Sequence, residues 1–155
     1  MKFIKYILII IATIIVDQLS KFWIVSNFDL YESQTIIDGF LSLKYVQNTG
    51  AGFSILEGKM LFLLLVTCVA LIFLLYLLFK ANDKAILEKV SISLMIGGAL
   101  GNFIDRLNLG YVVDFIACNI FGYPFPVFNL ADSSLTIGVL LFIINILKES
   151  RHGKA

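Results

Sequence analysis

The chain has 155 residues, of which 59% are hydrophobic and 15% are charged, with a mean hydropathy of +0.94 and a net charge of +1. A soluble domain is usually about 45–50% apolar and about 25% charged, so this composition indicates an integral membrane protein. The near-neutral charge gives no electrostatic basis for binding nucleic acid. The single histidine lies in the charged tail, so the sequence offers almost no ligands for a His-ligated zinc site. Cys68 and Cys118 are expected to be free thiols.

Four segments approach the length of about 20 mostly apolar residues that a membrane-spanning helix needs. Their expected bounds are 6–24, 60–79, 88–106 and 127–147. The first follows Lys2 and Lys5, as in a signal peptide, but Ile14-Ile15-Val16-Asp17 is no small-residue cleavage site. We therefore expect an uncleaved span, with cleavage as the minor alternative. The sequence predicts one integral membrane domain over residues 1–155, an all-α protein built as a four-transmembrane-helix bundle.

The loop between the first two spans, residues 27–58, carries two signals of β-structure. Asp38-Gly39 lies between apolar runs, which is typical of a hairpin turn. Residues 41–45 then alternate between apolar and polar, as a half-buried strand does. We expect a small extramembrane β-sheet over one mouth of the bundle. A turn rich in small residues follows at 48–53, and we expect it to act as a lid in which Gly50 and Gly52 supply backbone freedom.

Lysine and arginine residues are enriched on the cytoplasmic side of membrane proteins. If both termini are cytoplasmic, eight of the twelve lie inside and four lie outside, so this orientation is expected. Four spans also bring the end of the first, the end of the third and the start of the fourth to one membrane face. The polar residues that meet there, at the outer face, are Asp17, Asn102, Arg106, Asp114, Asn129 and Asp132.

Two aspartates at the edges of apolar segments are the first candidates for chemistry. Asp114 follows two valines in a β-like stretch, and Asp132 lies about one turn inside the fourth span. An ionisable residue at membrane depth is costly and by default indicates a functional site. Two carboxyls at close range cannot both ionise cheaply, so they would share a proton and activate a water between them. Alone, Asp114 would be interpreted as a loop carboxylate in water.

Further polar groups accompany the two aspartates. Asn129 lies one turn before Asp132 on the same helix face, and Asn102 and Arg106 share a face of the third helix. Arg106 has two equally supported interpretations: it snorkels to lipid headgroups, or it turns inward and balances the carboxylates.

Small and hydroxyl-bearing residues of the third and fourth spans are assigned to packing. Gly97 and Gly101, four positions apart, predict a close helix contact. Ser133, Ser134 and Thr136 are expected to hydrogen-bond between helices rather than to take part in chemistry.

Five short motifs occur in order along the chain. They are Asp17-Gln18-Leu19-Ser20-Lys21, Asn48-Thr49-Gly50-Ala51-Gly52-Phe53, Gly101-Asn102-Phe103-Ile104-Asp105-Arg106, Val112-Val113-Asp114-Phe115 and Phe128-Asn129-Leu130-Ala131-Asp132-Ser133. Together they closely resemble the bacterial lipoprotein signal peptidase family, also called signal peptidase II. The resemblance runs from Asp17 to about Leu147, and five motifs in order across four spans are highly specific. The departure is Gly52, where Ala or another small residue is expected.

The resemblance implies a multi-pass aspartic endopeptidase of the bacterial cytoplasmic (inner) membrane. Such an enzyme removes the signal peptide from diacylglyceryl-modified prolipoproteins, cuts just before the lipidated cysteine, and requires no cofactor or metal. Its partners would be the lipid-modified prolipoprotein and membrane lipid, and a monomer would hold the whole site. By motif match the catalytic pair is Asp114 and Asp132, and the supporting residues are Asp17, Asn48, Asn102, Arg106 and Asn129.

Other classes of protein explain less of the sequence. A small proton-coupled transporter, the alternative function, would also keep carboxylates inside a bundle, but these acids cluster at one mouth and no inverted repeat is visible. A non-catalytic scaffold would explain the helices but not five polar motifs on one face. A serine peptidase would need a base beside Ser133, and Lys21 is the sole candidate.

Overall fold

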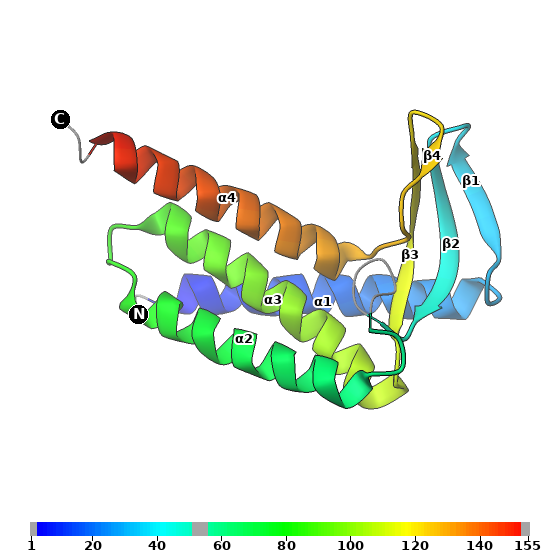
Figure 1. The fold of residues 1–155 in the computed structure, drawn as a ribbon, viewed down its shortest axis with the longest axis horizontal. Coiled ribbons are helices and arrows are strands. Elements are labelled where there is room, and N and C mark those ends of the chain that lie inside the picture. Colours follow the sequence, from blue (N-terminus) through cyan, green and yellow to red (C-terminus); the bar gives the residue numbers. More distant parts are fainter. Residues whose placement is uncertain (1–2, 51–55, 153–155) are drawn as a thin grey trace.

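The computed structural model describes residues 3–50 and 56–152. Within these residues, four helices lie side by side and a four-stranded sheet stands across one end of them (Figure 1). The helices are α1 (Ile4–Asn27), α2 (Met60–Lys80), α3 (Ile86–Leu109) and α4 (Leu130–His152). All four are long and apolar enough to cross a membrane. The predicted four-helix membrane bundle with a small sheet over one mouth is therefore confirmed.

The helix ends differ from the predicted apolar spans for local reasons. Helix α3 continues three residues past 106 and ends where Gly110 adopts a left-handed φ of +78°, as glycine commonly does after a helix. Helix α4 begins at Leu130 rather than at 127. The residues before it are extended, because the backbone of Phe128 exchanges hydrogen bonds with Ile116.

Helix α3 is the centre of the bundle and packs against each of the other three helices. Glycines make these contacts close. A Cβ on Gly97 would lie 2.7 Å from the Cβ of Thr13 in α1, and one on Gly138 would lie 2.8 Å from the carbonyl oxygen of Ser91 in α3. Small residues at such crossings let two backbones approach and gain dispersion contacts, which drive helix association in lipid. The predicted packing role of Gly97 and Gly101 is confirmed, since a Cβ on Gly101 would meet Asp17.

The sheet is antiparallel, in the order β1 (Ser33–Ile37), β2 (Leu41–Asn48), β3 (Val112–Ile120) and β4 (Tyr123–Pro124). The predicted hairpin joins β1 to β2, with Gly39 at a φ of +71° in its turn. The sheet is not confined to residues 27–58, as the sequence suggested, because β3 and β4 come from the connection between α3 and α4. Residues 51–53 of the expected lid lie outside the described part of the chain.

Strand β2 runs three residues further than the predicted strand, to Asn48, which pairs with Val112 of β3. One face of the sheet packs on the end of α1, where Val113 and Phe115 join Ile24 and Phe28 in a buried cluster. Successive side chains of a strand point to opposite faces. Asp114, between Val113 and Phe115, therefore points away from α1, toward the start of α4.

Candidate active site

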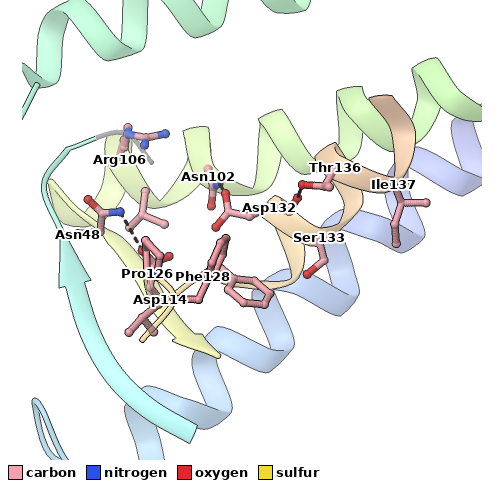
Figure 2. A pocket seen from close by; sticks show the side chains of 13 residues that line it. Asn48, Asn102, Arg106, Asp114, Pro126, Phe128, Asp132, Ser133, Thr136 and Ile137 are labelled. Atoms are coloured by element: carbon pink, nitrogen blue, oxygen red, sulfur yellow. Dashed lines mark hydrogen bonds between the residues drawn. The ribbon is translucent and has the colours of Figure 1, made fainter. Parts of the chain in front are cut away.

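A cavity of about 470 Å³ opens where the sheet meets α3 and α4. Figure 2 shows Asn48 of β2 directed toward Asp114 of β3, and Asn102 of α3 beside Asp132 of α4. The sequence-predicted residues that line it are Asn48, Asn102, Arg106, Asp114 and Asp132. The remaining wall is largely apolar and comes from the segment 125–128 and from the start of α4.

Asp132 is held by the start of its own helix. The backbone N–H of Asp132 donates to Oδ1 of Asn129 (3.0 Å), and the backbone N–H of Asn129 donates to Oδ2 of Asp132 (3.1 Å). This reciprocal pair is a capping box, which satisfies two of the N–H groups left unpaired at a helix start. Helix formation itself therefore fixes the carboxyl at the cavity wall, with its other oxygen receiving Nδ2 of Asn102 at 2.7 Å.

Asp114 is 3% exposed and receives two side-chain hydrogen bonds. Nδ2 of Asn48 donates to its Oδ2 at 2.8 Å, and Nδ2 of Asn129 donates to its Oδ1 at 2.7 Å. The pKa of Asp114 is raised to about 7, chiefly by burial and also by the nearby charge of Asp132, while the bonds from Asn48 and Asn129 oppose the rise. Asp114 is thus a carboxyl that exchanges its proton near neutral pH.

Asn129 is the residue that joins the two carboxyls. It is fully buried, and it donates to Asp114 through its side chain while its backbone N–H and side-chain oxygen hold Asp132. The same side chain donates to Oδ1 of Asn102 at 3.0 Å. One residue therefore sets the geometry of both acids relative to each other.

The orientation of the Asn102 amide follows from its neighbours. Its Oδ1 faces two donors, Nζ of Lys21 at 2.9 Å and Nδ2 of Asn129, so Oδ1 must be the acceptor. Its Nδ2 is left to donate to Asp132. Lys21 thereby fixes which end of Asn102 meets the carboxyl.

Behind the cavity lies a buried charge cluster made by Lys21, Asp17 and Asp105. Nζ of Lys21 is 2.8 Å from Oδ2 of Asp17 and 3.0 Å from Oδ2 of Asp105, and all three side chains are at most 4% exposed. Asp17 also accepts the N–H of Ala131 in the first turn of α4 (2.9 Å), and Asp105 accepts the N–H of Val113 in β3 (3.0 Å). The cluster links α1 and α3 to the start of α4 and to β3. It therefore holds in place the two elements that carry Asp132 and Asp114.

Sequence reasoning placed Asp17 near the site but missed Lys21 and Asp105. Both residues lie within the five motifs but were not among the candidate site residues, and both are buried. The i, i+4 spacing of Asp17 and Lys21, opposite charges on one face of an apolar helix, was the available signal. Nothing local marked Asp105, because its partners come from α1 and β3.

Arg106 turns inward to the cavity, and it does not snorkel to headgroups. Its Nη2 donates to the carbonyl oxygen of Gly50 at 3.0 Å, and its buried Nε has no hydrogen-bond partner among the described residues. Its guanidinium thus lies in the cavity wall.

The hydroxyls of the fourth helix bond within that helix, whereas interhelical bonds were expected. Ser133, Ser134 and Thr136 donate to backbone carbonyls one turn earlier. Ser133 and Thr136 also line the cavity. These hydroxyls therefore use backbone carbonyls as their acceptors, and among the described residues none of them donates to the carboxyl of Asp114 or Asp132.

The fold and the cavity together define a multi-pass membrane protein with a buried acid–amide site at one mouth of its helix bundle. The chain matches the family of signal peptidase (SPase) II over residues 9–148. It is 47% identical, over 148 residues, to the lipoprotein signal peptidases of Staphylococcus aureus strains JH9 and Newman, a match that covers 96% of this chain and 91% of each relative.

Two solved structures described as bacterial membrane enzymes share the fold. One superposes with a TM-score of 0.89 at 47% identity, covering 94% of this chain and 89% of the other, and the second with a TM-score of 0.85 at 48% identity, covering 93% of both. The chain belongs to the signal peptidase II family and is a multi-pass bacterial membrane peptidase. The predicted family is confirmed, and the transporter alternative finds no support.

Proposed function

We propose that this peptidase is an aspartic endopeptidase that removes the signal peptide from diacylglyceryl-modified prolipoproteins, cutting just before the lipidated cysteine. The relatives are named lipoprotein signal peptidases, which supports this substrate class. The observation that carries the aspartic assignment is that one buried residue, Asn129, donates to both carboxyls, to Asp114 through its side-chain amide and to Asp132 through its backbone N–H. Two carboxyls held in this way beside a cavity suit hydrolysis by a shared proton.

The reaction divides between the two acids. The ionised carboxyl takes a proton from a water molecule as the water oxygen attacks the scissile carbonyl carbon. The protonated carboxyl donates its proton to the carbonyl oxygen and stabilises the charge that develops there. Collapse of the tetrahedral intermediate breaks the C–N bond, with a proton passing to the leaving amine of the lipidated cysteine. A pKa of about 7 for Asp114 keeps a proton available for the pair at neutral pH.

The other residues position these groups and the substrate. Asn129 and Asn102 orient the carboxyls, and Asn48 orients Asp114 from the end of β2. Arg106, whose guanidinium lies in the cavity wall, binds a substrate carbonyl or a lipid headgroup oxygen. Asp17 braces the start of α4. These roles require neither a metal nor an organic cofactor.

The membrane arrangement follows from the same proposal. The chain acts as a monomeric single domain in the cytoplasmic membrane, with both termini cytoplasmic and the site near the outer face. The excess of lysine and arginine on the terminal side supports this orientation. A site at the outer mouth gives water access while the acyl chains and signal helix of the substrate remain in the bilayer.

The test is cleavage of a purified diacylglyceryl-modified prolipoprotein by the wild-type protein, Asp114→Asn and Asp132→Asn in detergent. The control is Asp38→Asn in the exposed β1–β2 turn, which changes an acid on the same side of the bundle. We expect activity in the wild type and in Asp38→Asn, and none in Asp114→Asn or Asp132→Asn. Activity that survives in either dyad variant refutes the aspartic mechanism, and an inactive wild type on several lipidated substrates refutes the substrate class.

A further inference from the structure

A second cavity, of about 430 Å³, lies on the sheet side of Asp114. It shares four lining residues with the first cavity: Asn48, Asp114, Pro126 and Val127. The side chain of Asp114 therefore stands in a wall common to both spaces. A chain bound across Asp114 would have one part in each cavity.

The two cavities differ in chemistry. Away from the shared residues, the first cavity has polar groups near Asp132 and Arg106, and the apolar side chains of Val112, Phe125, Phe128 and Ile137 form the rest of its wall. Among the described residues, the second cavity has a single apolar side chain there, Val46, and is otherwise bounded by Tyr31, Lys44, Gln47, Thr49 and Glu57 of the loop and sheet. An extended substrate whose one side is apolar and whose other side is polar would therefore be bound in a single direction.

The polar wall is held in place by its own contacts. Lys44 lies on β2, which has a hydrogen-bonded strand on each side, so its backbone is fixed. Oγ1 of Thr49 donates to Oε1 of Glu57 at 3.1 Å, which occupies one lone pair of that carboxylate. Nε2 of Gln47 donates to the hydroxyl of Tyr45 at 3.0 Å. Lys44 is the basic residue among the described lining residues of this cavity, and Glu57, partly engaged by Thr49, is the opposite charge on its wall.

We propose that the second cavity binds the first residues of the mature polypeptide, those that follow the lipidated cysteine, and that Lys44 favours an acidic side chain among them. This proposal rests on the function proposed above. A prolipoprotein has an apolar signal segment before the cut and a water-exposed polypeptide after it, and the two parts must leave the dyad in different directions. The first cavity matches the former part and the second cavity matches the latter.

The experiment compares two diacylglyceryl-modified substrates that differ only at the residue after the lipidated cysteine, Asp in one and Lys in the other. The quantity measured is the ratio of kcat/KM for the two substrates. It is determined for the wild type, for Lys44→Glu and for Lys59→Glu, a control lysine that is exposed and lines neither cavity. Because each ratio is taken within one preparation, a partly unfolded variant does not alter it.

We expect the wild type to prefer the Asp substrate and Lys44→Glu to shift the ratio toward the Lys substrate by roughly 5-fold, the size typical of reversing one solvent-accessible ion pair. Lys59→Glu should leave the ratio unchanged. A third substrate stops at the lipidated cysteine, whose carboxyl group is amidated, so it has no residue to place in the second cavity. It should be cut with a lower kcat/KM, and Lys44→Glu should not change that value.

An unchanged ratio in Lys44→Glu, or an equal shift in Lys59→Glu, overturns the assignment of the second cavity. Both results presuppose that the wild type cleaves the lipidated substrates, so they are distinct from failure of the proposed function. If Lys44→Glu is too unstable to purify, Lys44→Gln is used, and the expected shift is about half as large on a logarithmic scale.

Discussion

Replacing Asn129 by Ser or by Ala separates its two tasks. Its Oδ1 caps α4 by accepting the N–H of Asp132, and its Nδ2 donates to Asp114. Ser caps helices about as well as Asn, but its hydroxyl is too short to reach Asp114 as the amide does. Ala provides neither bond. The two variants leave similar space behind, so their difference reports the cap alone.

The expected magnitudes follow from the bonds that are lost. A hydrogen bond to a charged group contributes about 1.5–3 kcal/mol, so both variants should lose roughly 10- to 150-fold in kcat/KM. Loss of the cap costs about 1 kcal/mol, which corresponds to a Tm about 2–4 °C lower for Ala than for Ser. Since the bond from Asn129 lowers the pKa of Asp114, its removal should also move the alkaline limb of the pH profile upward from about pH 7 in both variants.

The assays are cleavage of a lipidated prolipoprotein across pH 5–9 and thermal unfolding in detergent, both on the same preparations. Wild-type activity in Asn129→Ser would refute the inference that the amide donor orients Asp114. Activity losses that follow Tm, small in Ser and large in Ala, would assign the whole effect to the helix cap.

Three further predictions concern the pH profile, the buried charges and the helix packing. Wild-type kcat/KM should fall as pH rises through about 7, because the raised pKa of Asp114 means that the pair loses its shared proton there; a profile flat to pH 9 would contradict this. Lys21→Met leaves two buried carboxylates without their cation and should destabilise the protein by about 3–5 kcal/mol, measured by SDS titration. Adding Asp105→Asn should recover part of this loss, whereas an unchanged unfolding midpoint in Lys21→Met would show that the ion cluster is not stabilising. Gly98→Ala places a methyl group on the carbonyl oxygen of Ala131, so it should cost about 1–3 kcal/mol and reduce cleavage, and a wild-type Tm would exclude tight α3–α4 packing at this point.

Part of the site was readable from the sequence because it depends on local rules. Asn129 and Asp132 occupy the first and fourth positions of a capping box, and this spacing is visible in the sequence. From the sequence we interpreted the two residues only as sharing a helix face. Asn102 and Arg106 share a face of α3 for the same kind of reason, since the helical period fixes their spacing. The inward direction of the Arg106 side chain could not be predicted in this way, because it depends on the carbonyl oxygen of Gly50, which lies in a distant loop and accepts a hydrogen bond from Arg106.

Strand β3 marks the limit of that reasoning. Its valines and aromatic residue suggested a β-like stretch, but its partner, β2, lies more than sixty residues earlier in the chain. Pairing over that distance depends on packing against α1, not on the strand's own composition. The same pairing draws Asn48 into a strand and against Asp114, where the sequence predicted a turn.

The sequence by itself determined the four spans, their connectivity and the gathering of polar residues at one mouth, because a bilayer of fixed thickness admits only long apolar helices and their order then dictates which ends meet. Only the tertiary structure decided which polar groups touch. Lys21, Asp105 and the amide of Asn129 acquire their partners from other elements, and burial, which makes each of these contacts necessary, exists only once the helices and the sheet have packed together.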